Sequence, residues 1–467
     1  MANTYYTPGV YIEEISKFPP SITAVETAIP AFIGFTQQAS KDGLDIFGTP
    51  VRISSLLEYE NIFGGPQPEI NLVVSINDDP RTGKQYNVSF DESDGKGASK
   101  HIMYYALQQF FANGGGPCYI ISTGAYLQLG TPITDQAPFE NALTELRKQD
   151  EPTLIIFPEG QNMPKDTYKS LLELALTQCF DLKDRFVIMD LFNNGVKLKT
   201  EGDILTAAGD FRDAISLSGD YLSYGAVYFP NIRSTFDYVY TASTVTIKGG
   251  SAPTFDGLNN LEKANVKLAI SNYSILLPPS AAVAGVYARV DNDRGVWKAP
   301  ANEGLLSVSG VTCDINDRIQ QNLNVDTNAG KSINAIRFFS GKGIKIWGAR
   351  TLNGNSNEWR YVSVRRYFNM VEESTKKATE AFVFEPNDAN TWVKVKAMIE
   401  NFLINQWRAG ALAGAKPEHA FYVKVGINET MTAFDILEGR MIVEIGLAVV
   451  RPAEFIILRF SHKMQES

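Results

Sequence analysis

The residue types in this chain that could support metal or redox chemistry are three histidines and three cysteines. The histidines are His101, His419 and His462, and the cysteines are Cys118, Cys179 and Cys313. Zinc sites use closely spaced patterns such as H-E-x-x-H or C-x-x-C. Neither spacing occurs, so we expect no metal centre and interpret each lone histidine as a surface or capped residue. The separated cysteines favour a reducing compartment over a disulfide framework.

Two segments come close to known phosphate- and calcium-binding loops. Residues 340–343 (SGKG) lack the Ser or Thr after lysine and the first glycine that a P-loop requires. Residues 291–295 (DNDRG) have their glycine one position early for a calcium loop, and Asn302 stands where a bidentate glutamate is needed. We therefore expect no cofactor, and we interpret 291–295 as a solvated loop in which Arg294 pairs with a neighbouring acid.

Adjacent acidic residues do not make a catalytic pair either. Glu13-Glu14 and Glu372-Glu373 are sequence neighbours, and neighbouring positions on a strand or helix point apart, so we expect exposed charge. The chain also has no G-x-S-x-G elbow to present a serine nucleophile. These observations favour a protein that is not an enzyme. An α/β enzyme with an irregular active site is the alternative of a different class.

Composition and charge narrow the class further. The 467 residues are 44% hydrophobic and 20% charged, which predicts a globular protein of two to four domains. A net charge of −9 argues against a main role in binding nucleic acid or an anionic membrane. The longest apolar stretch, Met441 to Val450, contains Glu444 and is too short to span a bilayer. The first twenty residues lack the basic and apolar regions of a secretory signal.

Over the first two thirds of the chain, the sequence predicts alternating strands and helices, and these α/β elements would have to position any site. Apolar strands and amphipathic helices alternate: strands at 31–36, 118–122, 153–157, 185–190 and 225–230, and helices at 137–148, 165–179 and 203–215. This alternation predicts a mostly parallel sheet covered on both faces. Residues 66–100 are polar and predict a small surface insertion with at most a hairpin, and 236–247 alternate like a second hairpin.

From about residue 302 the pattern changes. Strand-rich sequence leads to two long amphipathic helices at 360–382 and 389–411, the second capped by Asp388. Strands are expected at 420–425, 440–450 and 454–460. The predicted fold class is thus α/β followed by α+β. We divide the chain into an N-terminal arm and linker (1–24), an outer α/β domain (25–300) and an inner α+β domain (301–467).

Both chain ends are strongly strand-forming, which is unusual because termini fray unless they are tied down. Residues 10–15 (VYIEEI) precede a diproline, and residues 455–460 (FIILRF) lie close to the end. Pairing of each arm with a neighbouring copy would be heterologous and would build a ring or a helix. The alternative is that the N-terminal strand completes the sheet of its own domain.

The C-terminal region is also relatively basic. Residues 360–467 hold 14 Lys plus Arg and 13 Asp plus Glu, whereas the remainder holds 29 and 39. In the second long helix Lys394, Lys396 and Arg408 outnumber Asp388 and Glu400. That helix could face an acidic partner, and a solvated helix face is the alternative.

Seven segments in order along the chain resemble one family: TPGVYIEEI, AFIGFT, FFANGGGPCYIIS, PPSAAVAGVYARVDNDRGVWKAPAN, INAIRFFSGKGIKIWGART, WRYVSVRRYFNMVEES and RPAEFIILRF. Together they resemble the sheath proteins of contractile phage tails and related bacterial contractile injection systems. The short insertion at 66–100 makes the sequence most similar to the injection-system and small-sheath members. The sheath of a phage virion is the alternative within the same class.

The resemblance implies a structural polymer in which six-fold rings of this homo-oligomer stack around an inner tube protein. It implies intersubunit arm strands at Val10, Tyr11, Ile12, Glu13 and Glu14 and at Phe455, Ile456, Ile457, Leu458 and Arg459. The tube-facing residues it suggests are Lys394 and Lys396. Baseplate proteins, terminal cap proteins and paralogous sheath subunits are the other implied partners. The resemblance further implies a metastable extended state, assembly in the bacterial cytoplasm, and a released, envelope-anchored or virion-borne particle.

Overall fold

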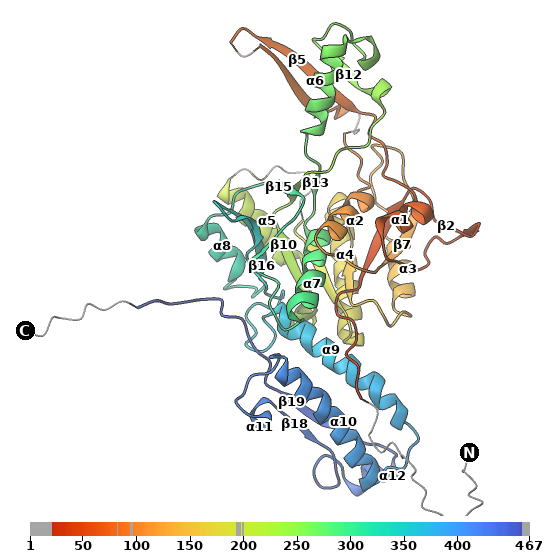
Figure 1. Ribbon diagram of the computed structural model, residues 1–467, viewed down its shortest axis with the longest axis vertical. Coiled ribbons are helices and arrows are strands. Elements are labelled where there is room, and N and C mark those ends of the chain that lie inside the picture. Colours follow the sequence, from red (N-terminus) through yellow and green to blue (C-terminus); the bar gives the residue numbers. More distant parts are fainter. Residues whose placement is uncertain (1–20, 82, 94–96, 193–197, 199, 460–467) are drawn as a thin grey trace, which may run out of the picture. The chain divides into compact units, whose positions relative to one another are not determined.

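The computed structural model describes residues 21–81, 83–93, 97–192, 198 and 200–459. The chain forms two compact units, drawn in Figure 1. Unit 1 comprises Met1–Ala24 and Glu373–Val450, and unit 2 comprises Val25–Glu372 and Arg451–Ser467. The predicted N-terminal arm strand, Val10 to Glu14, lies outside the described residues.

Unit 2 is built on a nine-stranded sheet with the order β14-β17-β16-β10-β9-β8-β1-β7-β4. Its strands are β1 (Pro30–Thr36), β4 (Val51–Ile53), β7 (Cys118–Ala125), β8 (Leu154–Ile156), β9 (Phe186–Asp190), β10 (Gly225–Phe229), β14 (Glu303–Gly304), β16 (Ile333–Phe339) and β17 (Gly343–Ile346). The pairings from β7 through β1, β8, β9 and β10 to β16 are parallel, and β4, β17 and β14 add antiparallel pairings at the two ends. The predicted, mostly parallel sheet is confirmed.

Helices cover both faces of this sheet, as the alternation predicted (Figure 1). One core packs α3 (Ala137–Leu146), α4 (Lys165–Leu182), α5 (Glu201–Ala214) and α8 (Asp317–Asn324) against the strands. The other packs α1 (Leu56–Phe63), α2 (Met103–Ala112) and α7 (Ser280–Arg294). All seven residues of β1 are buried, because a strand that is sandwiched between two helix layers has no solvated face.

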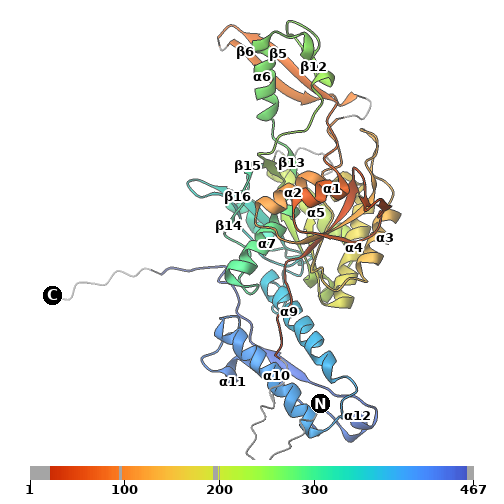
Figure 2. The same cartoon turned by 45° about the vertical axis from the view of Figure 1, so that its right-hand side comes forward.

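A small subdomain is inserted into unit 2 and has its own core (Figure 2). Its elements are β5 (Leu72–Asp79), β6 (Gly83–Phe90), β12 (Thr246–Lys248) and α6 (Asn260–Ser271). The hairpin allowed within 66–100 is confirmed, since β5 and β6 pair antiparallel. The second expected hairpin, at 236–247, is wrong: β12 instead pairs parallel with β5. We call these four elements the insertion subdomain.

The remaining short elements of unit 2 connect the larger ones. Two small sheets consist of β13-β11-β15 and β2-β3, and their strands are β2 (Ser40–Lys41), β3 (Leu44–Asp45), β11 (Ile232–Ser234), β13 (Leu276–Leu277) and β15 (Val308–Val311). The 3-10 turns are η2 (Gly160–Asn162), η3 (Gly219–Tyr224), η4 (Ala242–Thr244), η5 (Phe255–Gly257) and, in unit 1, η6 (Glu380–Phe382).

The compact units divide the chain at a different place from the domain boundary expected at residue 300. The strands between residues 303 and 346 belong to the large sheet, because β16 pairs with β10 and brings β17 and β14 with it. The division falls instead after Glu372, inside the long helix α9 (Val362–Thr379). Sequence spacing could not place it there, since the same sheet is built from segments more than 100 residues apart.

Unit 1 contains a long helix and a two-stranded sheet. Its further elements are α10 (Ala389–Arg408), α11 (Pro417–Ala420), β18 (Phe421–Lys424), α12 (Ala433–Leu437) and β19 (Glu444–Leu447). The predicted cap is confirmed, since the Asp388 side chain accepts a hydrogen bond from the backbone N–H of Thr391. Val395, Ile399 and Phe402 lie on the buried stripe of α10, as expected of an amphipathic helix.

Candidate intersubunit surfaces

The sheet of unit 1 is incomplete among the residues that the structure describes. β18 and β19 pair antiparallel over only four residues each, from Phe421↔Leu447 to Lys424↔Glu444, and no further named strand joins them there. A two-stranded sheet is marginal on its own, because it cannot bury enough apolar surface. Tyr422 on β18 is 47% exposed. Among the described residues, residues 411–413 bond to residues 448–450 beyond β19, and no named strand pairs with the outer edges of β18 and β19, where a strand could add.

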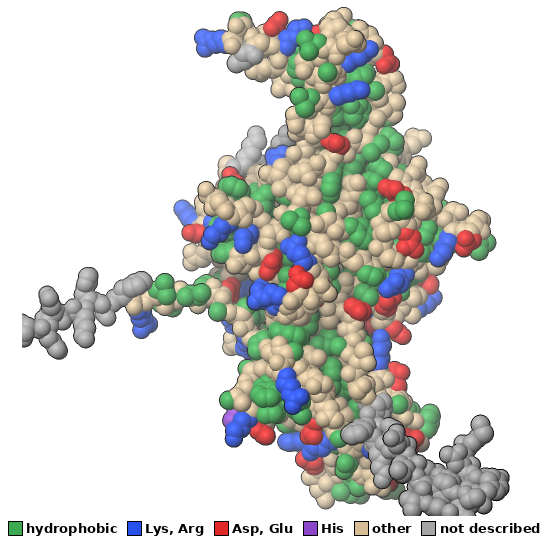
Figure 3. All heavy atoms as spheres, viewed as in Figure 1, with side chains coloured by type: hydrophobic (Ala, Val, Ile, Leu, Met, Phe, Trp, Pro, Cys, Tyr) green, Lys and Arg blue, Asp and Glu red, His purple; other side chains and the backbone are tan. Residues whose placement is uncertain are grey.

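The C-terminal segment of unit 2 exposes four consecutive apolar residues. The exposed fractions of Phe455, Ile456, Ile457 and Leu458 are 70%, 79%, 76% and 73%. Figure 3 shows hydrophobic side chains along this segment toward the C-terminal end. The strand expected at 454–460 is not formed through Arg459, because a strand needs a partner to pair with. A contiguous exposed apolar segment of this kind is typical of an interaction site.

The root of that segment is held by hydrogen bonds. Glu454 accepts hydrogen bonds from Arg350 Nη2 at 2.7 Å, from Asn324 Nδ2 at 2.7 Å and from Tyr361 OH at 3.1 Å. Arg451 Nη1 donates to the carbonyl oxygen of Asn357 at 2.7 Å. Burial favours a raised pKa for Glu454, but the hydrogen bonds from Arg350 and Asn324 outweigh it and the pKa is lowered. The carboxylate is thus held in its charged form.

A second arginine fixes the first described residues of unit 2. Arg366 Nη2 lies 2.5 Å from Asp291 Oδ2 and also donates to the carbonyl oxygen of Thr27 at 2.8 Å. Thr27 Oγ1 donates to the same carboxylate at 2.6 Å. The expected solvated loop at 291–295 is wrong, because Asp291 continues helix α7 and its side chain is only 7% exposed. The expected partner of Arg294 is a neighbouring acid, but the nearby acid Asp291 pairs with Arg366, 75 residues away in sequence.

The two tube-facing candidates lie on α10 and point in different directions. Residues two positions apart on a helix are separated by about 200° around its axis. Accordingly, Lys394 is exposed and Lys396 is half-buried. Val393, beside Lys394, is also 66% exposed. The exposed face of α10 at this point therefore combines one cation with an apolar side chain.

Two expectations about acidic and histidine side chains are wrong. His101 is not on the surface: it is buried, and its Nδ1 lies 3.3 Å from Glu159 Oε1 while its Nε2 accepts from the N–H of Leu127. Glu159 also accepts from the N–H of Phe35 on β1. Burial raises the pKa of Glu159, and the hydrogen bond from His101 opposes that rise. His101 and Glu159 thus satisfy each other's hydrogen-bonding capacity, and Glu159 helps to hold β1 in place through the N–H of Phe35.

Glu373 is likewise buried instead of exposed. Its side chain is 7% exposed and pairs with Lys376 at 3.1 Å and Lys377 at 3.3 Å on the same helix. Glu372 is 40% exposed and pairs with Arg365. The two carboxylates still point apart, as the sequence indicated. The other adjacent pair, Glu13-Glu14, lies outside the described residues.

A buried carboxyl stands at the carboxyl end of β9. Asp190 Oδ1 accepts from the Ser280 N–H at 2.9 Å and Oδ2 accepts from the Ser280 hydroxyl at 2.6 Å. Burial raises the pKa of Asp190 to about 7, while the hydrogen bonds from Ser280 act in the opposite direction. This pair joins the start of helix α7 to the large sheet.

Within the part of the chain that the structure describes, no group of three or more His, Cys, Asp or Glu side chains could hold a metal ion. Over the same residues, none of the helices combines the length and apolar character that crossing a bilayer requires. What the described residues do offer is an open sheet edge and an exposed strand-forming tail. An open sheet edge and an exposed strand-forming segment are the two sides of a strand-addition contact.

Comparison with known proteins identifies the class of assembly. A family model described as the phage tail sheath C-terminal domain matches residues 355–463. The tail sheath protein of Burkholderia phage BcepMu is 29% identical over 151 residues, which are 31% of this chain and 31% of that protein. The tail sheath protein of Enterobacteria phage T4 is 29% identical over 122 residues, 25% of this chain and 17% of that protein. The aligned part thus spans about a third or less of these curated relatives.

Solved sheath structures match over nearly the whole chain. The helical sheath of the anti-feeding prophage (AFP) in its contracted state is 32% identical, covers 98% of this chain and 100% of that one, and has a TM-score of 0.67. The PVC sheath complex of an extracellular contractile injection system, also contracted, is 30% identical, with 99% coverage of both chains and a TM-score of 0.66. The chain therefore belongs to the contractile sheath family, as its seven segments indicated.

Proposed function

We propose that this chain polymerises helically around an inner tube and contracts to drive that tube through a target cell envelope. Similarity to the AFP and PVC sheath chains over 98% and 99% of its length supports a phage-tail-like injection system. The observation that carries the proposal is the presence, in one chain, of an incomplete two-stranded sheet and an exposed apolar tail. The exposed tail can supply a further strand to the sheet, and the sheet can supply the hydrogen-bonding partner that the tail needs to form a strand.

In this proposal the arms are strands that neighbouring copies exchange. Phe455 to Arg459 of one molecule, and Val10 to Glu14 of another, add to the β18–β19 sheet of a third. Each strand makes a handful of backbone hydrogen bonds at about 1 kcal/mol net each, and its apolar side chains add a few more. Six-fold rings that are stacked and linked in this way form a mesh. Its connectivity persists while the bodies between the arms rotate.

The domain roles follow from this mesh. We propose that the part carrying β18, β19 and α10 forms the inner layer with the arms, and that the α/β part with the insertion at 66–100 faces outward. We take this inner layer to be unit 1, which consists of the arm segment Met1–Ala24 and of Glu373–Val450. Lys394 and Lys396 on α10 are the proposed contacts to the tube, which then has an acidic surface.

The stroke in this proposal needs no catalysis and no cofactor. The extended lattice is metastable, and packing energy released on contraction moves the tube. Similar chains occur in structures of the AFP baseplate, one of them in the contracted state, which supports a baseplate as the partner that triggers release. Terminal cap proteins and paralogous sheath subunits complete the proposed particle. It assembles in the bacterial cytoplasm and then acts outside the cell or from the envelope.

A second candidate is the tail sheath of a phage virion. The family model that matches residues 355–463 and the curated phage sheath proteins favour it. The two candidates share the mesh and differ in the particle. A particle purified from the native source and imaged by electron microscopy separates them, because a virion carries a DNA-filled capsid and an injection system does not.

Negative-stain microscopy of the concentrated purified protein tests the proposed function. Long striated tubes are expected, whereas discrete particles with catalytic turnover would favour an α/β enzyme. Deleting residues 1–16 should leave a folded, soluble monomer that cannot polymerise. Tubes of normal length from this truncation would refute the N-terminal arm. Deleting residues 455–467 is the corresponding test of the C-terminal arm, with the same expected loss of tubes.

A further inference from the structure

The C-terminal segment changes from fixed to free within a single residue. Glu454 uses both of its carboxylate oxygens: Oε1 faces Arg350 Nε at 3.0 Å and Asn324 Nδ2 at 2.7 Å, and Oε2 faces Arg350 Nη2 at 2.7 Å and Tyr361 OH at 3.1 Å. The next residue, Phe455, is 70% exposed. The end of the fixed stretch therefore coincides with the start of the predicted arm strand.

The fixed stretch is built from inside unit 2. The side chain of Arg350 is 6% exposed and that of Glu454 is 22% exposed, so their bidentate pair is shielded from solvent. Charge-assisted bidentate pairs of this type constrain both direction and distance. Three residues earlier, Arg451 donates to the carbonyl oxygen of Asn357 at 2.7 Å, and Pro452 follows it. Since proline restricts its own φ and the conformation of the residue before it, the root has few alternative paths.

We infer that Glu454, held by Arg350, is the anchor that sets the register of the C-terminal arm strand in its acceptor sheet. This inference rests on the proposed exchange of arms. A strand slipped by one residue turns its apolar side chains to the opposite face of the sheet, so an arm with a loose root would sample unproductive registers. A fixed root removes those states before docking and lowers the entropic cost of ordering the arm.

The simpler alternative is that the Arg350–Glu454 pair only stabilises the fold of unit 2. The two roles predict different measurements. A purely structural pair would change the unfolding of the isolated subunit and leave the polymerisation of folded subunits unchanged. An anchor would change the concentration of folded subunits at which tubes form. If Glu454 is an anchor, residues inserted between Glu454 and Phe455 should also weaken polymerisation.

The first experiment uses Glu454→Gln in the full chain, which keeps the side-chain volume but places an amide NH2 against the donors that surround it. Tube formation is followed by sedimentation and microscopy, and the unfolding of dissociated subunits by circular dichroism. We expect the subunit concentration required for tubes to rise about tenfold at temperatures where the variant subunit is folded. The melting temperature of the subunit should also fall, because Arg350 loses its charged partner, so only the tube measurement tests the anchor. Glu92→Gln, an exposed residue of unit 2 outside the root and the β18–β19 sheet, is the matched control and should behave as the unmodified chain.

The second experiment leaves the anchor intact and changes only the tether. A Gly-Ser insertion between Glu454 and Phe455 adds slack and shifts the strand by two positions, so it should weaken polymerisation to a similar extent. The same insertion between Arg459 and Phe460, beyond the proposed strand, is the control. In the Glu454→Gln variant the same upstream insertion should weaken polymerisation little further. The root is already mobile in that variant, so two extra residues change the position of the arm strand less.

The outcomes separate this inference from the proposed function. If Glu454→Gln and the Gly-Ser insertion both form tubes at normal concentrations while deletion of 455–467 abolishes them, the arm exchange stands and the anchor is overturned. If deletion of 455–467 leaves tubes normal, the exchange itself fails. If Glu454→Gln does not fold, the insertion variant decides: tubes at the normal concentration overturn the anchor, and loss of tubes specific to the upstream insertion supports it.

Discussion

The guanidinium of Arg366 on helix α9 lies 2.5 Å from the carboxylate of Asp291 on helix α7, and both side chains are nearly fully buried, with exposed fractions of 3% and 7%. The ring of Tyr287 lies 4.5 Å from the same guanidinium. Because Arg366 also donates to the carbonyl oxygen of Thr27, this pair joins three segments that are far apart in sequence. A buried ion pair of this kind is costly to break, since the remaining partner keeps its charge without compensation.

Substitution of Asp291 should therefore destabilise unit 2. We expect Asp291→Ala to lower the free energy of unfolding by about 3–5 kcal/mol, the range typical of a buried pair that loses one partner. Urea titration of the unpolymerised subunit, monitored by fluorescence, measures the change. Asp293→Ala is the matched control on the same helix, because Asp293 is exposed and its removal should cost little. Equal effects of the two substitutions would contradict the assigned role of the pair.

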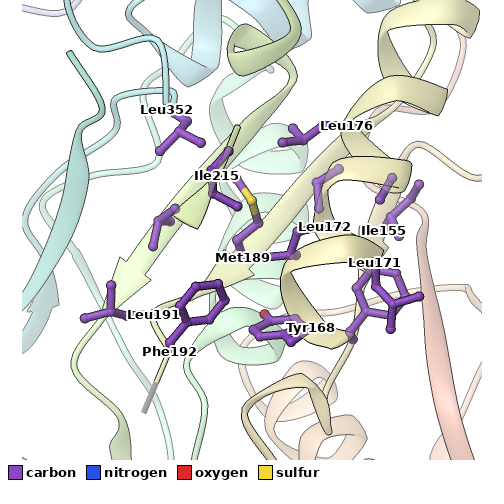
Figure 4. Close-up of a cluster of buried hydrophobic side chains, with 14 of the residues drawn as sticks. Ile155, Tyr168, Leu171, Leu172, Leu176, Met189, Leu191, Phe192, Ile215 and Leu352 are labelled. Carbon is purple, nitrogen blue, oxygen red and sulfur yellow. The ribbon is translucent and has the colours of Figure 1, made fainter. Parts of the chain in front are cut away.

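Helix α4 provides a second stability test on one face of the large sheet. Leu172 is fully buried against a core that includes Met189 and Ile155, as Figure 4 shows, whereas Leu174 on the same helix is 42% exposed. Leu172→Ala leaves a cavity and should cost about 2–5 kcal/mol. Leu174→Ala changes the same residue type on the solvated face and should cost far less. Thermal unfolding of both variants gives the comparison, and a similar loss in the two would argue against this packing.

The raised pKa of Asp190 predicts a pH dependence of stability. Burial raises this pKa from 3.8 to about 7, so between these values the folded state holds a proton that the unfolded state has released. The free energy of unfolding should thus fall as the pH rises from about 4 to about 7 and level off above that. Asp190→Asn should flatten this part of the curve. Urea titrations at several pH values measure it, and an unchanged slope in the variant would refute the assignment.

The proposed contact of α10 with the tube predicts a separation of two assembly steps. Lys394→Glu places a negative charge on the exposed face and should abolish assembly of the sheath around the tube while sheath subunits still polymerise alone. Co-sedimentation with purified tube protein measures the first step, and microscopy measures the second. Lys342→Glu, an exposed residue in the turn between β16 and β17 and outside α10 and the β18–β19 sheet, is a control for the change of charge. Normal assembly of Lys394→Glu around tubes would rule out this face.

Local patterns predicted the large sheet well and the contacts across it poorly. The strand at residues 30–36 and helix α4 are continuous apolar or periodic stretches, so burial alone determines them. His101 and Glu159 are 58 residues apart, and each looks unremarkable in sequence because only the folded sheet brings them together. The parallel pairing of β12 with β5 was missed for the same reason, since two short strands that far apart carry no mutual signal.

The surface segments gave a different result. Residue type predicts that Phe455 to Leu458 form a strand. In the structure these residues are exposed and are not assigned to a strand. The hydrogen bonds that hold their root could not be predicted, because Arg350 lies 104 residues before Glu454. The sequence thus predicts that the tail is strand-forming. The point at which the tail leaves the body can be located only in the folded structure.

The insertion subdomain has a hydrophobic core that shares no buried residue with either core of the large sheet. Its β5–β6 hairpin and α6 thus form a packing unit of their own, which meets the body at ring contacts such as that between Phe90 and Tyr238. In the proposed lattice, where this part faces outward, a reporter grafted onto the segment would be displayed in many copies per particle. A substitution confined to this small core leaves the buried residues of both cores of the large sheet as they are.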